Sequence, residues 1–484
     1  MADPSCLGPA RAWASSAAVL AAWLAAASTA MYAIYSVHGV VILCVVAVVV
    51  VAGVWFGVFR TFPPTVVVTV LALAVVAALI VTPPLINVHR TGWLVPATIV
   101  GCVAAASTLV VFAPRFSAGR LALVPLGITA LAFAGMILGG TPVVDVWVIF
   151  QQSARGLLHG ANPYAMTFSG VPAGQTSNCF NYLPVTFLLT APSQWLFGDV
   201  RWIEAACLLA TGGLLVWHVA GRGASRGRVA LAALVALTPG ALLVVQQAWN
   251  EPILLLGLVA TAVLMERGRW NWAMLPLGLA LATKQHLVLL LPLLLFWPKF
   301  GWRRVLGSVG IAAAVSLPWL VANPSRFTLC TADFFLGEQA PPKALSIWRI
   351  LPEPVRMPML LVGMVVVFAV VLWRCQRTPT GFLVGAGSVF VVFDLLNKQT
   401  FVNQWWLAAA LLVSGLALNG TVDGTVDGTV DGTADGTAGR ADGVDGTVNT
   451  DLADVGRADA GRADASGTDA SGTDEGGTVR VSQC

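Results

Sequence analysis

A polar stretch between Asp145 and Pro184 interrupts an otherwise apolar sequence and carries the side chains best suited to chemistry. It begins with one acid, Asp145, continues through residues 156–164 (Gly-Leu-Leu-His-Gly-Ala-Asn-Pro-Tyr), and ends with residues 181–184 (Asn-Tyr-Leu-Pro). Ionisable groups at the edge of a membrane are costly, so they indicate a functional site by default. A carboxylate placed there can accept a proton from a substrate hydroxyl group. Capping of a helix over residues 146–158 is an alternative role for Asp145.

More ionisable residues lie at breaks between apolar runs, at Trp249-Asn250-Glu251, at residues 283–286 (Thr-Lys-Gln-His), and at Asp394 and Lys398. Each also has a structural interpretation. Glu251 can form an ion pair with a lysine, Lys284 can extend its amine to the interface, and Asp394 can pair with Lys398 at a helix end.

The composition predicts an all-α polytopic membrane protein. Hydrophobic residues make up 57% of the chain and charged residues 10%, whereas soluble domains carry about 25% charged residues. Basic residues are scattered over short loops, which favours a topology signal over nucleic-acid binding. No Gly-x-Gly-x-x-Gly fingerprint for a nucleotide is present. The outer loops contain no Asp-x-Asp pair, so we expect neither a cofactor nor a tightly bound metal ion.

Apolar runs long enough to cross a bilayer divide the chain. They fall near residues 14–36, 39–59, 64–85, 94–113, 121–139, 202–220, 229–247, 250–265, 303–321, 358–373, 380–396 and 400–418. The positive-inside rule predicts that 272–298 enters and returns as two short segments broken at 283–286. It also predicts that 182–197 lies on the outer surface without crossing. The expected total is about 14 crossings, with both chain ends in the cytoplasm and the residues singled out above on the outer face.

Three regions follow from these runs: extra helices over 1–116, a membrane core over 117–418 with outer loops 140–201 and 322–357, and a tail over 419–484. The tail contains Thr-Val-Asp-Gly repeats, and after Gly420 it holds 13 acids and four arginines. Because such a composition cannot bury a core, we expect a disordered cytoplasmic tail. Cys179 and Cys330 are the only cysteines expected in outer loops, so a disulfide between them is one option and two free thiols the other.

The motifs of the polar stretch resemble the first outer loop of GT-C membrane glycosyltransferases, and are most similar to glycosyltransferase family 87. That family uses polyprenyl-phosphate mannose. Its pattern is an Asp after a transmembrane helix, an Ala-Arg-x-Leu-Leu-x-Gly-x-x-Pro-Tyr helix and a Tyr-Pro-Pro segment. Here these positions are Asp145, residues 154–164 and residues 182–184, with Leu183 in place of the first proline. The resemblance covers about residues 144–418, and about four extra spans precede it.

The resemblance implies a GT-C-like bundle that moves a sugar, mannose in this family, from a polyprenyl-phosphate donor to an extracytoplasmic acceptor with inversion. Asp145 would be the general base. The leaving phosphate needs cations, for which the candidates are Lys284, His286, Lys398 and Arg349. Candidates for other substrate contacts are Arg155, Tyr164, Tyr182, Asn250 and Glu251. The acceptor would be a glycolipid, a polysaccharide or a protein, and the surrounding membrane lipid is a further partner.

Two other functions fit parts of the sequence. Broken helices and buried charges are typical of transporters, so a transporter or flippase of a lipid-linked sugar is the alternative, although the two halves show no internal repeat. A non-catalytic scaffold whose acidic tail recruits a partner is the third reading.

Overall fold

The computed structural model describes Trp23 and residues 37–56, 64–81, 90–113, 115–142, 144–171, 179–337, 344–375 and 377–419. All of them belong to one compact unit, Met1–Thr429. The second unit, Val430–Cys484, and with it the predicted tail, lies outside the described residues. So does almost all of the predicted span over 14–36. Every regular element in the described ranges is helical.

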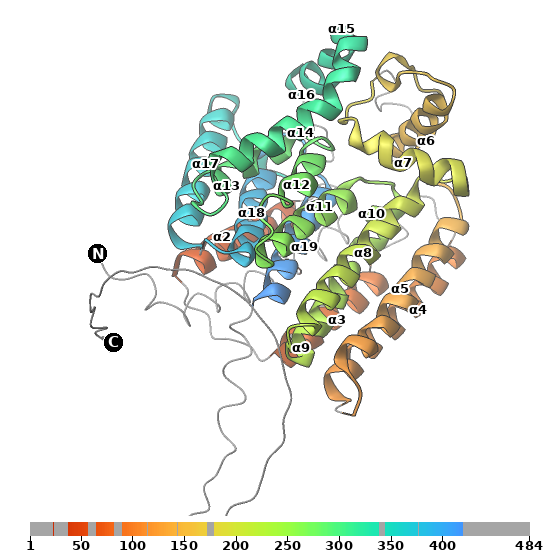
Figure 1. The fold of residues 1–484 in the computed structure, drawn as a ribbon, viewed down its shortest axis with the longest axis vertical. Helices are drawn as coiled ribbons and strands as arrows, with labels where there is room; N and C mark the ends of the chain where they lie inside the picture. The colour runs from red at the N-terminus through yellow and green to blue at the C-terminus, as the bar shows by residue number, and fades with distance from the viewer. Residues whose placement is uncertain are drawn as a thin grey trace, which may run out of the picture. The chain divides into compact units, whose positions relative to one another are not determined.

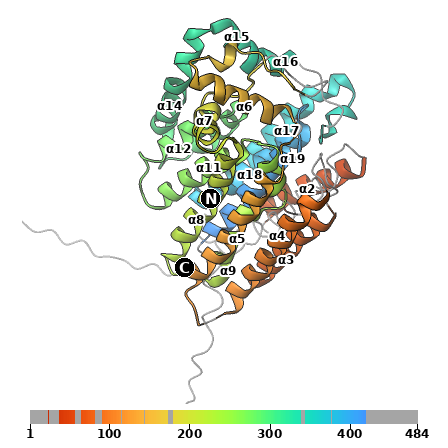
Figure 2. The same cartoon turned by 90° about the vertical axis from the view of Figure 1, so that its right-hand side faces the viewer.

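The first half of the described chain contains long helices, with two shorter helices and a 3₁₀ turn before the last of them. In order they are α2 (Val37–Phe56), α3 (Pro64–Val81), α4 (Arg90–Phe112), α5 (Ala118–Leu138), α6 (Asp145–Leu158), η2 (Pro163–Ala165), α7 (Val185–Phe197) and α8 (Arg201–Ala220). Helices α3, α4 and α5 lie side by side (Figure 2). Helix α5 then packs on α8, and α3, α4 and α5 all contact α9, so the N-terminal helices join the rest of the bundle.

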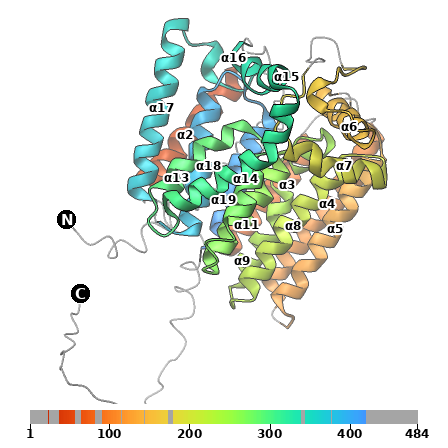
Figure 3. The same ribbon diagram turned by 45° about the horizontal axis from the view of Figure 1, so that its top comes forward.

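The second half alternates long helices with short, broken ones. These are α9 (Arg226–Leu234), η3 (Val235–Leu237), α10 (Ala241–Gln246), α11 (Glu251–Glu266), α12 (Met274–Leu281), η4 (Gln285–Leu290), α13 (Leu291–Leu295), α14 (Gly301–Ala322), α15 (Pro324–Thr328), a π-helical turn η5 (Leu329–Asp333), α16 (Phe334–Gly337), η6 (Ile347–Arg349), α17 (Glu353–Arg374), α18 (Pro379–Leu396) and α19 (Val402–Leu418). Helices α2, α17 and α18 lie together (Figure 3).

Seven helices in the described ranges are long and apolar enough to cross a membrane. They are His38–Trp55, Ala118–Leu138, Arg201–Ala220, Arg226–Gln246, Gly301–Ala322, Glu353–Arg374 and Pro379–Leu396. The fold is therefore that of a polytopic helical membrane protein, and the higher number of about 14 crossings stays a prediction. Two expected spans form shorter helices. Helix α11 has 16 residues and α19 has 17, whereas about 20 residues are needed to cross a bilayer.

The predictions for the stretches 272–298 and 182–197 are confirmed at the level of local structure. The stretch 272–298 is divided into α12 and the pair η4–α13, with Lys284 in an extended conformation between them. The stretch 182–197 contains only α7, whose 13 residues span about 20 Å at 1.5 Å per residue. Such a helix is too short to cross the bilayer, as expected.

Helices α18 and α19 pack closely against each other inside the bundle. Nearly every residue of α19 is buried, and small residues let the two helices approach closely. A Cβ atom on Gly387 would lie 2.7 Å from Leu412 Cγ and 2.9 Å from the carbonyl oxygen of Ala408. There is thus no room for a side chain at this contact.

The Gly387 contact gives a first testable prediction. Gly387→Ala should lower the free energy of unfolding by about 1–3 kcal/mol, because overpacking forces the neighbouring helix to move. Gly213→Ala is the matched control: its Cβ meets nothing within 4 Å, and alanine is the better helix former. Thermal unfolding of both variants in detergent measures the difference. Equal behaviour of the two variants would contradict the packing described here.

A second, smaller apolar core lies at one end of the bundle, where α6, α7 and α15 lie (Figure 1). Aromatic side chains from both predicted outer loops fill it. Tyr164 packs on Phe327, with ring centroids 4.7 Å apart, and Phe187 packs on Trp319 of α14 at the same separation. The loops over 140–201 and 322–357 thus form one layer that carries the candidate site.

Candidate functional site

Helix α6 holds Asp145 at its first position. Its apolar face is formed by Val146, Ile149, Phe150 and Ala154, which are buried and follow the three-to-four-residue spacing of an amphipathic helix. Gln151 fixes this helix against the start of α8: its Nε2 donates to the carbonyl of Gly198 at 2.9 Å, and its Oε1 accepts from the Val200 amide at 3.0 Å. Asp145 is therefore placed by a helix that is packed and hydrogen-bonded.

The Asp145 carboxyl group is only partly exposed. Burial raises its pKa, while hydrogen bonds from the backbone amides of Val146 and Asp145 act in the opposite direction. The cap residue of the helix is Val144, not Asp145. The carboxylate nevertheless interacts with the first-turn amides, so the structural role weighed for Asp145 and a role as proton acceptor coexist in this arrangement.

Tyr182 packs on Phe150 of α6, the helix that begins at Asp145, with ring centroids 4.9 Å apart, and Tyr164 is hydrogen-bonded to Tyr182. The Tyr164 hydroxyl donates to the carbonyl of Tyr182 at 2.8 Å, and Asn162 Oδ1 accepts from the Tyr164 amide at 3.0 Å. Burial raises the pKa of the Tyr182 hydroxyl, and the charges of Asp145, Glu251 and Glu204 raise it further. The charges of acids on three separate helices, α6, α8 and α11, thus act on the Tyr182 hydroxyl.

The motifs at residues 181–184 and 283–286, about 100 residues apart, pair directly through their backbones. The amides of Leu183 and Val185 donate to the carbonyls of Thr283 (3.1 Å) and Ala282 (3.0 Å). On the same side, Gln285 Nε2 donates to the carbonyls of Asn181 at 3.2 Å and Thr331 at 3.0 Å. The carbonyls at the break in the stretch 272–298 therefore have hydrogen-bond partners in the segment before α7, as buried backbone groups require.

Lys284 leaves this break and forms an ion pair with Glu251. Its Nζ lies 2.5 Å from Glu251 Oε1 and 5.6 Å from the centre of the Tyr182 ring. Asn403 Nδ2, from the first turn of α19, donates to the same Oε1 at 2.6 Å. Glu251 is fully buried and Lys284 is 11% exposed. The pair joins α11, the break and α19 beneath Tyr182.

Further buried polar atoms surround the pair without hydrogen-bond partners in the described structure. They are Glu204 Oε1 and Oε2, Glu251 Oε2, Asn250 Oδ1, Asn403 Oδ1 and Asp394 Oδ2. Buried polar groups are normally hydrogen-bonded, and each exception requires an explanation. Together with the ion pair of Glu251 and Lys284, the atoms on Asn250, Glu251 and Asn403 form a polar centre within an apolar protein. Unpaired buried polar atoms also occur elsewhere in the described residues, for example on Gln247 and Ser346.

Four further predicted site residues have surroundings of their own. His286 packs between Phe390 and Phe393 of α18, at 5.2 Å and 6.5 Å between ring centres. The Lys398 amine donates to the carbonyl of Leu336 at 3.1 Å. Arg349 and Arg155 are exposed, on η6 and in the last turn of α6. Contacts therefore link Tyr164, Tyr182, Glu251 and Lys284, with Asn250 next to Glu251 in the chain. The charge of Asp145 acts on Tyr182, and that of Lys284 acts on His286.

The sequence reasoning missed two members of the centre. Glu204 interrupts the apolar run 202–220 and Asn403 the run 400–418, and an ionisable or amide side chain inside a span is itself a signal of function. Asp394 was noted but not assigned to the site. Among the described residues, no three His, Cys, Asp or Glu side chains form a group able to hold a metal ion.

Cys179 and Cys330 form a disulfide, with Cα atoms 5.2 Å apart. It joins the two outer loops across 151 residues of sequence and borders the aromatic core. Because a cross-link restricts the unfolded chain, Cys330→Ser should lower the free energy of unfolding by about 2–4 kcal/mol. Cys102→Ser, at an exposed free cysteine, should have little effect. Thermal unfolding with and without reductant measures both, and an unchanged Cys330→Ser variant would argue against a stabilising cross-link.

Fold and site together define a polytopic, all-helical membrane protein with a polar centre at one end of its bundle. Comparisons with models of known protein families, with curated proteins and with solved structures find no match to this chain.

Proposed function

We propose that this protein is a membrane glycosyltransferase that moves a sugar, with mannose as the first candidate, from a polyprenyl-phosphate donor to an acceptor hydroxyl group. The observation that carries the proposal is the ion pair of Glu251 with Lys284 beside Tyr182, whose ring packs on Phe150 of the helix that begins at Asp145. An acid for the acceptor and a cation for a phosphate are the two groups that such a transfer requires.

Asp145 is the general base in this proposal. Transfer with inversion needs one carboxylate that takes the proton from the attacking hydroxyl group, and no nucleophile on the enzyme. The proton passes to the carboxylate oxygen as the new glycosidic bond forms and the bond to the carrier phosphate breaks. The partial exposure of Asp145 leaves it open to an acceptor, and burial on its other side limits competing water.

Lys284 stabilises the phosphate that leaves. Its charge is offset here by Glu251, so a bound phosphate would share Lys284 with this carboxylate. Charge stabilisation in a water-poor site contributes strongly to catalysis because the groups are already oriented. The Tyr182 ring lies 5.6 Å from the Lys284 amine, and the charge of Asp145 acts on the Tyr182 hydroxyl. Arg349, Lys398 and His286 have no part in this version of the site.

The disulfide supports an extracytoplasmic site, because such bonds persist in oxidising compartments. Basic residues at the opposite end of the bundle support the same orientation, because the positive-inside rule places such an end in the cytoplasm. Arg222 bonds to Glu266 at the end of α11, and Arg228 bonds to the last carbonyls of α19.

A transporter of a lipid-linked sugar is the second candidate, and the interrupted stretch 272–298 favours it. Broken helices with charges beside the break are typical of transporters. The polar groups here gather at one end of the bundle, under a folded outer layer, which favours chemistry at a surface over passage through the middle.

The pH dependence of the transfer rate gives a further prediction. A general base works only when ionised, and burial raises the pKa of Asp145, so activity should fall as the pH drops through this raised value. The acidic limb should therefore lie above the ordinary range for aspartate, near 3.9. Initial rates measured from acid to neutral pH define this limb. A rate that stays constant down to the usual aspartate range would count against Asp145 as the base.

The function itself is tested with purified protein, polyprenyl-phosphate mannose labelled in the sugar, and membrane extract as the source of acceptor. The expected result is label in a new product whose formation requires the protein. Label that stays in the donor, with protein that is folded and monodisperse, would contradict the proposed function with this sugar.

A further inference from the structure

A pocket lies at the end of α18 remote from the polar centre. Helix α18 runs from Pro379 at the pocket to Asp394 near Lys284, about 22 Å at 1.5 Å per residue. Its walls come from three places in the sequence: the end of α13 with the residues that follow it, the last turns of α17, and the first turn of α18. This pocket is separate from the site described above.

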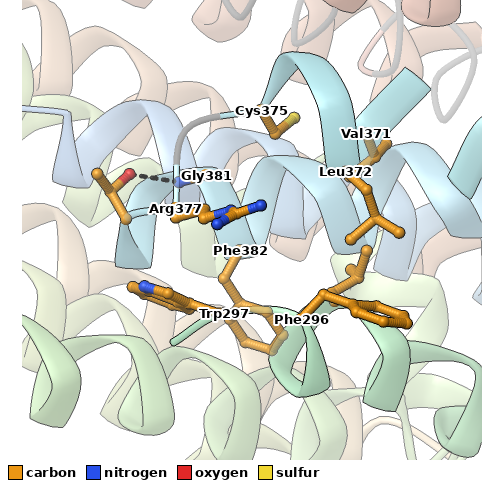
Figure 4. A pocket seen from close by; sticks show the side chains of 10 residues that line it. Phe296, Trp297, Val371, Leu372, Cys375, Arg377, Gly381 and Phe382 are labelled. Atoms are coloured by element: carbon orange, nitrogen blue, oxygen red, sulfur yellow. Dashed lines mark hydrogen bonds between the residues drawn. The ribbon is translucent and has the colours of Figure 1, made fainter. Parts of the chain in front are cut away.

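The walls of the pocket are almost entirely apolar. Phe296 and Trp297 follow α13, Val371 and Leu372 belong to α17, and Phe382 belongs to α18. Figure 4 shows the three aromatic side chains along one side of the pocket and the aliphatic side chains of α17 next to them. Phe296 and Leu372 are not fully buried, so the apolar walls open towards the surroundings of the bundle, where lipid chains lie.

One cation lies in this apolar setting. Arg377 lines the pocket beside the aromatic side chains (Figure 4) and is exposed. Within the described residues its guanidinium makes no hydrogen bond and no ion pair. Next to it, the Thr378 hydroxyl accepts from the Gly381 amide at 3.1 Å and caps α18. The positive end of the helix dipole adds to the charge of Arg377.

Basic residues predominate at this end of the bundle, where Glu266 at the end of α11 is paired with Arg222. Besides Arg377, this end carries basic residues at the end of α11, at the start of α14 and at the end of α17, namely Arg267, Arg269, Lys299, Arg303, Arg304 and Arg374. No carboxylate lines the pocket. Charge complementarity therefore points to an anionic occupant, and the apolar walls point to one with a hydrocarbon chain.

We propose that this pocket binds an anionic phospholipid of the membrane. The acyl chain packs between α13, α17 and α18 against Phe296, Leu372 and Phe382, and the phosphate of the head group lies at Arg377, which can bind it through two parallel N–H donors. The proposal does not depend on the glycosyltransferase activity, because it concerns the other end of the bundle.

Photolabelling in defined vesicles tests the proposal. The protein is reconstituted with a phosphatidylglycerol that carries a photoreactive group on one acyl chain, or with a phosphatidylcholine that carries the same chain, and labelled peptides are identified after digestion. Label from phosphatidylglycerol should concentrate on residues 293–297 and 371–382. It should exceed that from phosphatidylcholine by about fivefold, as expected for one basic residue at an anionic head group.

Two variants separate a built site from a generally basic surface. Arg377→Gln should bring phosphatidylglycerol labelling down to the phosphatidylcholine level. Arg303→Gln is the matched control: its guanidinium lies over Trp302 on α14, 5.5 Å from the ring centre, and labelling should persist. Equal labelling by both lipids, an unchanged Arg377→Gln variant, or an equal loss in both variants would each overturn the proposal.

Discussion

Replacing Asp145 with asparagine is expected to lower the rate of sugar transfer by about 10²–10⁴-fold, the contribution usual for a general base. Asparagine keeps the size of the side chain but cannot take the acceptor proton. Its oxygen can still accept from the backbone amides of Val146 and residue 145, so the start of α6 should remain intact. Initial rates with labelled donor, on protein checked for thermal stability, give the effect.

Asp333→Asn is the matched control for this substitution. Asp333 is an exposed acid in the π-helical turn η5 of the same outer layer, and the same chemical change there should leave the rate within about twofold, as for surface sites remote from the chemistry. If Asp145→Asn kept full activity, the proposed mechanism would fail. If it lost activity only by unfolding, the carboxylate would be structural and its cap interactions would be its main role.

The ion pair between Glu251 and Lys284 carries the second large effect. Glu251→Ala should lower the free energy of unfolding by about 3–5 kcal/mol, because it leaves a nearly buried ammonium group without its partner. Lys284→Ala should cost a similar amount for the opposite reason. With both residues changed, the loss should be smaller than the sum of the two, since neither charge then remains unpaired.

A matched pair elsewhere in the chain sets the scale for that experiment. Arg222 and Glu266 lie 3.0 Å apart, with Arg222 half exposed, and an exposed pair typically contributes 0–1 kcal/mol. The same three variants at this pair should show little coupling. Additive effects at Glu251 and Lys284 would mean that the two residues act independently and that the polar centre is not organised by their ion pair.

The sequence was sufficient for the parts of the fold that depend on local pattern. Composition and apolar runs predicted helices and a membrane, and the residues Thr283–His286 predicted a broken helix, because a polar turn cannot continue an apolar span. The short α7 followed from Pro184, Pro192 and the positive-inside rule. The pairing of Cys179 with Cys330 was one of two options, since both lie outside the apolar runs.

The composition of the centre could be predicted only in part. Asp145, Glu251 and Lys284 stand out because each is a charge at the edge of an apolar run, and the structure brings them to Tyr182. Glu204 and Asn403 join them through packing of α8 and α19, which no local pattern specifies. Conversely, His286 is two residues from Lys284 in sequence but packs on Phe390, because Lys284 is extended before the 3₁₀ turn and His286 lies within it.

The most direct test of the central claim places the purified protein in liposomes that contain labelled polyprenyl-phosphate sugar and an acceptor-bearing membrane extract. Sugar transfer and lipid transport are then measured in the same sample. We predict that the label becomes covalently attached to an acceptor, that the carrier phosphate is released, and that Asp145→Asn stops both. Intact labelled donor appearing in the opposite leaflet, with no new product, would contradict the enzyme and establish the transporter instead.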